Sequence, residues 1–380
     1  MSYEEKLNEF LKKELNEDLK VAPSPNPNMG DFGAACFTIA KKQNKNPVEF
    51  TKELAQKLKK PAFVKKIVAT GPYLNFFIKK EKLAKNVLQK IAKEKANYGK
   101  GKRKKEKVMI EFCQVNTHKA FHVGHFRGTL IGSGVVNIYR FLGHKTIAAN
   151  YQGDIGAHVA KTIWYLTRNE GKLEQPKEHK GRWLGQIYKE ANKMIGDNEE
   201  YKKEVSEILQ KLENGDKKLK KLWKETRKWS LDDFDEFYSM TGVKFDKLFF
   251  ESEFEEKGKT IVAKMVEDKL AYEDQGAIVI DLKNYNLGVF LLLKSDGTAL
   301  YSTKDLALAK EKFEKYKIDK SIYVVGAEQN MYLKQVFKTL EIMGFKQAKD
   351  CMHVSFGLVN LEGGKISSRE GELIYAEELV

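Results

Sequence analysis

Two histidines, His122 and His125, flank Gly124 at the start of a stretch whose apolar spacing is typical of a helix. Side chains three positions apart lie on one helical face, so both imidazoles can donate hydrogen bonds to one phosphate group. The free N–H groups of a helix N-terminus favour the same anion. Gly124 has no Cβ, so a base or ribose can approach the backbone there. The pattern indicates nucleotide binding, unless the histidines only cap the helix or fill the core.

A second candidate phosphate contact is Lys365, in the glycine- and serine-rich segment "GGKISSREG" at 363–371. A loop at the nucleotide-binding edge of a parallel sheet would bring Lys365 onto the β- and γ-phosphates, with hydroxyl groups from Ser367 and Ser368. Taken alone, the segment is more typical of a solvated turn. The sequence contains no GxxxxGK[ST] phosphate loop, which disfavours P-loop chemistry.

The elements around these residues alternate between strands and helices. A buried strand is expected at 108–114 and a helix at 122–142, followed by a strand at 145–153 and a helix at 156–168. Such alternation predicts an α/β fold with a Rossmann-like, doubly wound parallel sheet. A charged, mostly helical stretch at about 170–275 interrupts it and is interpreted as an insertion. The alternation then resumes with expected strands at 276–282, 289–294, 321–327 and 352–359 and expected helices at 302–315 and 331–343.

Residues 1–100 are predicted to form a separate, smaller α/β unit. An amphipathic helix opens the chain, and the proline and glycine residues of 22–33 prevent it from continuing. The segment "IVATGPYLNFFI" at 67–78 predicts two strands around a Gly-Pro turn. The basic, glycine-punctuated stretch at 99–107 is expected to link this unit to a second domain at 106–380.

Composition narrows the class of protein. The chain has 380 residues and a formal net charge of +15. Its lysine clusters at 99–107 and 217–229 favour a polyanionic partner over merely solvated helix faces. No apolar run reaches the ~18 residues of a membrane span, and the charged N-terminus does not resemble a secretory signal. The three cysteines are widely spaced, so we expect a cytoplasmic protein without a disulfide framework or a structural metal.

Longer segments carry a resemblance to a known family. "HVGH" at 122–125 resembles the HIGH signature of class I aminoacyl-tRNA synthetases, and "KISSR" at 365–369 resembles their KMSKS loop. In order along the chain, "IEFCQVNTHKAFHVGHFRGTLIG", "GHKTIAANYQGDIG", "KSDGTALYSTKDLALA", "YVVGAEQ" and "HVSFGLVNLEGGKISSREG" are similar to segments of arginyl-tRNA synthetases. "GDFGAACFTIAKKQNKNPVEFTKELAQKL" resembles that family's additional N-terminal domain. The resemblance covers essentially the whole chain.

The resemblance implies an arginine–tRNA ligase, which uses ATP to convert L-arginine to arginyl-adenylate and transfers the arginine to the 3′ end of tRNA(Arg). ATP would enter as its Mg²⁺ complex. By resemblance, His122 and His125 contact the ATP phosphates, and Gly124 supports the adenosine. Lys365 would stabilise the leaving pyrophosphate. The further ATP contacts implied by the resemblance are His353, Gly357, Ser367 and Ser368.

The arginine side chain calls for a distinctive pocket. A guanidinium group is planar and always charged, so carboxylates that can bind it in a bidentate way are required. Glu111, at the end of the first strand, and Asp305 are the candidates. Tyr301 lies four residues before Asp305 and therefore on the same helical face. By resemblance, Asn116 and Gln329 are polar ligands of arginine, toward its α-amino and carboxylate ends.

The sequence departs from the family pattern at several positions. Ser368 stands where the KMSKS loop often has a second lysine, and members without that lysine tend to carry one just before the HIGH signature. Lys119 has that place here, and we hypothesise that it supplies the missing positive charge to the phosphates. Lys304, His158 and Tyr332 also differ from the residue types common at their positions, which leaves the local geometry open.

In this family an all-helical anticodon-binding domain follows the KMSKS loop, whereas this sequence ends at Val380. We expect a truncated, monomeric form that contacts tRNA(Arg) but no membrane, with weak or absent charging activity. One alternative is an arginine- or tRNA-binding paralogue that lacks catalysis. Another is a different class I synthetase or adenylyl-transferring enzyme, which the two carboxylates Glu111 and Asp305 disfavour because they are unfavourable for a neutral or acidic amino acid.

Overall fold

The computed structural model describes residues 2–357, 360–361 and 364–365. The chain divides into two compact units, with the boundary between Lys100 and Gly101. Each unit has its own hydrophobic core. Among the residues that the structure describes, no helix has the length and apolar character needed to cross a membrane.

The N-terminal unit is an antiparallel sheet with strand order β1-β2-β4-β3, packed against helices. Asn46 begins the third helix, because its side chain accepts hydrogen bonds from the backbone of Val48 and Glu49 and Pro47 follows it. Leu7 and Leu11 of the first helix pack in one core with Phe76 of the sheet. The elements are α1 (Tyr3–Leu15), β1 (Val21–Pro23), β2 (Phe32–Ala35), α2 (Phe37–Lys42), α3 (Pro47–Lys57), β3 (Val64–Thr70), β4 (Tyr73–Ile78) and α4 (Lys80–Glu94).

The second unit is built on five parallel strands in the order β12-β11-β5-β6-β7, which confirms the predicted doubly wound sheet. From β5 the chain winds outward through β6 to β7, and it later returns to place β11 on the other side of β5. The strand order therefore reverses between β5 and β11, the position where such sheets bind ligands. The strands are β5 (Lys107–Glu111), β6 (Lys145–Gln152), β7 (Lys247–Phe250), β11 (Lys320–Gly326) and β12 (Cys351–Phe356).

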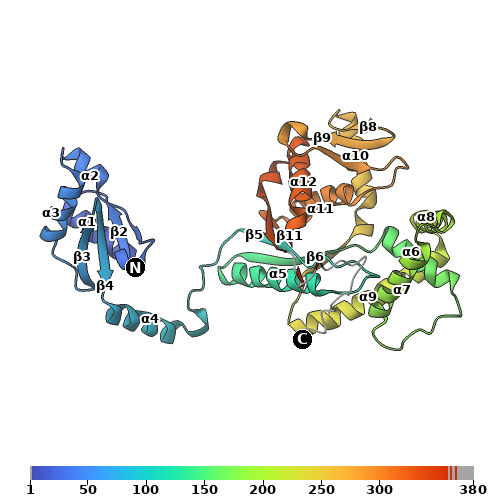
Figure 1. The fold of residues 1–380 in the computed structure, drawn as a ribbon, viewed down its shortest axis with the longest axis horizontal. Helices are drawn as coiled ribbons and strands as arrows, with labels where there is room; N and C mark the ends of the chain where they lie inside the picture. The colour runs from blue at the N-terminus through green and yellow to red at the C-terminus, as the bar shows by residue number, and fades with distance from the viewer. Residues whose placement is uncertain (1, 358–359, 362–363, 366–380) are drawn as a thin grey trace. The chain divides into compact units, whose positions relative to one another are not determined.

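Helices cover both faces of this sheet (Figure 1). Helix α5 (Val123–Phe141) lies on one face, and α11 (Tyr301–Tyr316) and α12 (Asn330–Ile342) lie on the other. Side chains alternate between the faces along β5. Val108 and Ile110 belong to the core beneath α5, whereas Met109 packs in the same core as Leu308 of α11. The alternation places Glu111 on the α11 face, at the carboxyl end of the strand.

Four helices after β6 form the helical part of the unit, drawn in green and yellow in Figure 1: α6 (Ala157–Arg168), α7 (Lys180–Ile195), α8 (Glu199–Glu213) and α9 (Lys217–Thr241). Asp154 joins them to the sheet, because its buried carboxylate lies 2.6 Å from Arg227 of α9 and accepts a hydrogen bond from the Ser252 hydroxyl. β7 then pairs with β6, so the chain rejoins the sheet inside the range of about 170–275 that the sequence assigned to the insertion.

Two predicted strands of the parallel sheet lie elsewhere. β8 (Tyr272–Asp274), β9 (Ala277–Asp281) and β10 (Val289–Leu293) form a separate antiparallel sheet that packs with α10 (Glu255–Glu267) and α11. The prediction that 276–282 and 289–294 continue the parallel alternation is therefore wrong. The short connection between β9 and β10 permits only an antiparallel pair, since a parallel crossover needs a dozen or more residues. The remaining short strands, β13 (Asn360–Leu361) and β14 (Gly364–Lys365), pair with each other.

Candidate active site

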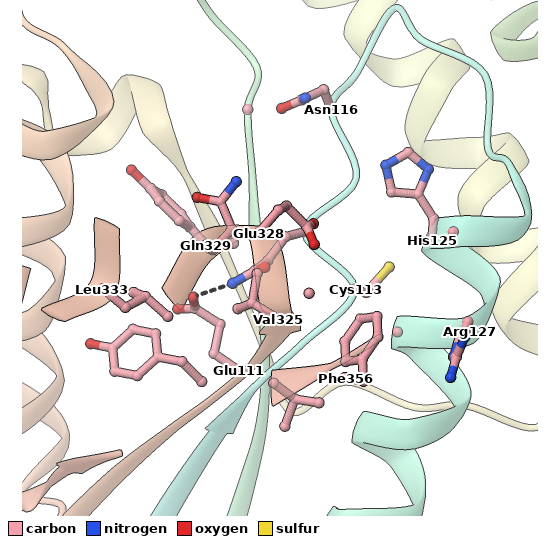
Figure 2. A pocket seen from close by; sticks show the side chains of 18 of the residues that line it. Glu111, Cys113, Asn116, His125, Arg127, Val325, Glu328, Gln329, Leu333 and Phe356 are labelled. Atoms are coloured by element: carbon pink, nitrogen blue, oxygen red, sulfur yellow. Dashed lines mark hydrogen bonds between the residues drawn. The ribbon is translucent and has the colours of Figure 1, made fainter. Parts of the chain in front are cut away.

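A cavity of about 390 Å³ opens at the carboxyl ends of β5 and β11, where the strand order reverses. Figure 2 shows its two sides: His125 and Arg127 project from α5, whereas Gln329 lies just before α12 and Leu333 lies in its first turn. The parallel sheet therefore brings together residues that are more than two hundred positions apart. The sequence-predicted residues that line the cavity are Glu111, Asn116, His122, Gly124, His125, Tyr301, Asp305, Gln329 and Gly357.

The other predicted site residues are not among the described residues that line the main cavity. Lys119 lines a smaller adjoining cavity of about 100 Å³ whose lining also includes His122 and His125. His353 does not line the main cavity, because its ring lies in β12 with Nε2 3.0 Å from the Val325 carbonyl oxygen. The backbone of Lys365 pairs with Asn360, but its side chain is outside the described part of the structure. Ser367 and Ser368 lie outside the described residues altogether.

The two histidines stack at the beginning of α5, with ring centroids 3.8 Å apart. Nδ1 of His122 accepts a hydrogen bond from the Gly124 backbone at 3.1 Å, and Nδ1 of His125 accepts one from the His122 backbone at 3.4 Å. The rings therefore do cap the helix, as the alternative interpretation held. A Cβ on Gly124 would lie 3.0 Å from Cε1 of His122, so the glycine makes room for the folded-back ring.

Burial sets the charge of both rings, and capping sets which ring nitrogen carries the proton. Burial, followed by the charge of Lys119, lowers the pKa of His122 to about 4. Burial and the neighbouring His122 and Lys119 hold the pKa of His125 well below its usual value. Both imidazoles are therefore neutral at pH 7. Because each Nδ1 accepts a backbone N–H, each Nε2 carries the proton and can donate it to an anionic oxygen.

Four carboxylates line the cavity, and two of them have buried lysine partners on α11. Oε2 of Glu111 lies 2.7 Å from Nζ of Lys312, and its Oε1 accepts a hydrogen bond from Gln114, the dashed line in Figure 2. Glu251, in the turn η3 (Glu251–Glu253), lies 3.1 Å from Nζ of Lys304. These lysines neutralise the two glutamates at the base of the cavity. The cavity-lining carboxylates are Glu111, Glu251, Asp305 and Glu328.

Asp305 differs from the two paired glutamates. Its Oδ2 accepts a 2.5 Å hydrogen bond from the Tyr332 hydroxyl, whereas its buried Oδ1 has no hydrogen-bond partner among the described residues. Burial raises the pKa of Asp305 to about 7, and the nearby charges of Glu111 and Glu251 add to this. Tyr301 packs edge-on against Tyr332, with the ring centroids 4.9 Å apart. A buried carboxylate oxygen without a donor is a site for a cationic group.

Two lining residues, Tyr151 and Glu251, and one residue beneath the cavity, Lys312, were not among the predicted site residues. Tyr151, at the end of β6, has a buried hydroxyl without a hydrogen-bond partner in the described structure. Glu251 follows β7, the strand that was assigned to the insertion. Lys312, which pairs with Glu111, offered one signal: it lies seven residues after Asp305, two turns along the same helical face. A lysine on the apolar face of a predicted helix calls for a buried anion.

The described residues contain neither a disulfide bond nor a cluster of side chains suited to a metal ion. Cys36, Cys113 and Cys351 are free thiols, and Cys113 lies 3.4 Å from the Tyr238 hydroxyl. In the part of the chain that the structure describes, no group of three or more histidine, cysteine or acidic side chains is arranged to hold a metal ion.

Comparisons with known proteins agree with this architecture. The family model described as tRNA synthetases class I (R), catalytic domain, matches residues 87–380. The model for the arginyl tRNA synthetase N-terminal domain matches residues 2–78. The chain belongs to the arginyl-tRNA synthetase family. The first match begins inside α4 and the second ends just before that helix, so the two matches together cover most of the chain.

Individual arginyl-tRNA synthetases are similar along almost the whole chain. The arginine–tRNA ligase of Bdellovibrio bacteriovorus is 38% identical over 362 residues, which cover 94% of this chain and 62% of that protein. The ligase of Halothermothrix orenii is 36% identical and is covered to 68%. The Thermus thermophilus arginyl-tRNA synthetase structure superposes with a TM-score of 0.72 at 25% identity and is covered to 68%. The chain thus spans about two thirds of the length of these relatives.

Proposed function

We propose that this chain carries the amino-acid-activating site of an arginine–tRNA ligase. The reaction is attack of the arginine carboxylate on the α-phosphorus of ATP, which gives arginyl-adenylate and pyrophosphate, followed by transfer of arginine to the 3′ end of tRNA(Arg). One observation carries the proposal: a single cavity has neutral imidazole donors on one side and the unmatched carboxylate of Asp305 on the other. An amino-acid cation and a nucleotide polyanion fit these two sides.

The imidazole side suits the chemistry at phosphorus. Negative charge grows on the phosphate oxygens as pyrophosphate leaves, so fixed hydrogen-bond donors stabilise the transition state more than the substrate. The Nε2–H groups of His122 and His125 are such donors, because their Nδ1 atoms are held by the backbone. We assign the leaving pyrophosphate to Lys365, with Ser367 and Ser368, and to Lys119, whose charge already acts on both histidines.

The carboxylate side suits the guanidinium group. We assign Oδ1 of Asp305 as its charged acceptor and Tyr301 as a ring that covers it. Asn116 and Gln329 line the same cavity and would bind the α-amino and carboxylate groups. Glu111 lines the cavity too, but its charge is already matched by Lys312, so we assign it to the base of the pocket and not to direct pairing with guanidinium.

The adenosine would lie over the glycines of the cavity rim. Gly124 and Gly357 line the cavity, with Phe356 beside them. Because His353 hydrogen-bonds to the backbone of Val325, we assign it to holding β12 against β11 and not to the adenine. ATP would enter as its Mg²⁺ complex, as the class I family implies, and the cation would neutralise phosphate charge during the reaction.

The tRNA would bind to basic surfaces of the chain. Lysines cluster at 99–107 and 217–229, and a surface of this kind attracts phosphates in a salt-dependent manner. We propose a cytoplasmic enzyme that acts on tRNA(Arg).

Arginine-dependent pyrophosphate exchange tests this function. The chain is incubated with ATP, labelled pyrophosphate and each amino acid in turn, with and without tRNA(Arg), and arginine binding is measured by calorimetry in parallel. Exchange with arginine alone among the amino acids is the expected result. Arginine binding without exchange under any condition would favour a binding paralogue, and exchange with a different amino acid would overturn the assignment.

A further inference from the structure

Lys312 is a fully buried lysine beneath the substrate cavity. Its side chain is 0% exposed, its Nζ lies 2.7 Å from Oε2 of Glu111, and it lies 3.9 Å from the ring centre of Tyr323. Tyr323 and Glu111 are direct neighbours across β11 and β5, so both point to the α11 face of the sheet. Burying an ammonium group is unfavourable unless it is paired with an anion. The buried Lys312 is therefore explained by the negative charge of Glu111 beside it.

Three carboxylates lie close together at the base of the cavity, and lysines pair with two of them. Asp305 is on the same helix as Lys312, two turns earlier, and it faces Glu111 of β5 and Glu251 of η3. Three carboxylates at the base of one cavity would repel each other and take up protons. Lys312 neutralises Glu111, and Lys304 neutralises Glu251. Asp305 is left as the buried carboxylate without a cationic partner in the described structure.

We propose that Lys312 is a positioning residue for the amino-acid substrate: by neutralising Glu111 it favours the ionised form of Asp305, whose Oδ1 then receives the guanidinium. The inference rests on the proposed function for its ligand. It gives α11 a defined role, because one helix supplies both the acceptor and the cations that balance the neighbouring carboxylates. The remaining titratable groups around Asp305 are the hydroxyls of Tyr332 on α12, Tyr151 on β6, Tyr323 on β11 and Tyr301 on α11.

If Lys312 acts by balancing the charge of Glu111, removing either charge should shift the ionisation of Asp305 in opposite directions. A purely structural role of Lys312 predicts no such pattern. Glu111 raises the pKa of Asp305 and Lys312 lowers it. Lys312→Met leaves Glu111 unmatched, so the ionisation of Asp305 should move to higher pH. Glu111→Gln leaves Lys312 unmatched and should move it to lower pH. Each shift is expected to be on the order of one pH unit. The double variant E111Q/K312M removes both charges and should return the midpoint to that of the unchanged protein.

The experiment is calorimetric titration of the full chain with L-arginine from pH 5.5 to pH 9, which gives the midpoint below which affinity is lost. Lys315→Met is the matched control, because Lys315 forms an exposed ion pair with Glu311 on the same helix and should leave the midpoint unchanged. A buried charge left alone could prevent folding of a single variant. In that case the double variant decides, since a shifted midpoint there overturns the inference.

This assay distinguishes failure of arginine binding from failure of the role of Lys312. If the unchanged protein does not bind arginine at any pH, the proposed function fails and the inference fails with it. If the unchanged protein binds arginine but Lys312→Met and Glu111→Gln shift the midpoint in the same direction, or leave it in place, only the role of Lys312 is overturned. Opposite shifts that cancel in the double variant would establish it.

Discussion

The rings of His122 and His125 lie 3.8 Å apart, and both direct Nδ1 to backbone N–H groups at the beginning of α5. The arrangement serves the fold and the site together. Capping satisfies orphan N–H groups of the helix, and the same contacts leave each Nε2–H as a donor on the cavity side. Helix capping and phosphate binding are therefore compatible roles for this pair.

Replacing either histidine should reduce activation far more than stability. His122→Ala or His125→Ala removes one donor to the phosphates, a loss of about 10²–10³-fold in rate for a donor of this type. Pyrophosphate exchange with arginine measures it. His179→Ala is the control, because this exposed histidine precedes α7 without a side-chain capping bond. Equal rates for His122→Ala and His179→Ala would contradict the assignment.

Arginine affinity should depend on pH through Asp305. Its pKa is raised to about 7, so the carboxylate is protonated and neutral below that pH and ionised above it. The dissociation constant of arginine is expected to rise about tenfold for each pH unit below the midpoint, because only the ionised form pairs with guanidinium. Calorimetry across the pH range measures this. The Tyr332 hydroxyl lowers the pKa of Asp305, so Tyr332→Phe should move the midpoint upward. Affinity independent of pH would exclude Asp305 as the counter-ion.

Lys119 should be required for activation but not for arginine binding. It lines the small cavity beside His122 and His125, on the phosphate side, and lies 5.3 Å from the Tyr188 ring. Lys119→Ala is expected to slow pyrophosphate exchange by orders of magnitude while the affinity for arginine changes little. Lys193→Ala, an exposed lysine on the same helix as Tyr188, serves as the control. An unchanged exchange rate in Lys119→Ala would exclude the hypothesis that Lys119 supplies the positive charge missing at Ser368.

The ion pair between the buried Asp154 and the partly exposed Arg227 should dominate the attachment of the helical part. Asp154 is 0% exposed and also accepts hydrogen bonds from the backbone and hydroxyl of Ser252. Asp154→Ala leaves Arg227 without its partner and is expected to cost about 3–5 kcal/mol of unfolding free energy. Denaturant unfolding measures the loss. Asp232→Ala breaks an exposed pair with Lys228 on the same helix and should change stability little. Similar losses in both variants would contradict this account.

The sequence was sufficient to predict the parallel sheet, because apolar strands and the helices that follow them are recognisable in short segments. Residues 108–110, which precede Glu111, are apolar on both faces of the strand, and a strand buried on both sides implies helices above and below it. The His122 and His125 pair was recognisable for the same reason, since its spacing and position after a strand are properties of a short segment. β9 and β10 were assigned to the wrong sheet, because apolar runs report burial and not the partner strand.

The sequence by itself indicated the family and the parallel sheet, and it singled out several residues that line the cavity at the ligand-binding edge. Only the tertiary structure decided how the charges of that edge are distributed. Glu111 and Asp305 look equivalent in the sequence, yet Lys312 lies 2.7 Å from the first, whereas the second has a buried oxygen without a partner in the described structure. The physical reason is that burial and pairing set the ionisation of a carboxylate, and both depend on side chains that are distant in the chain.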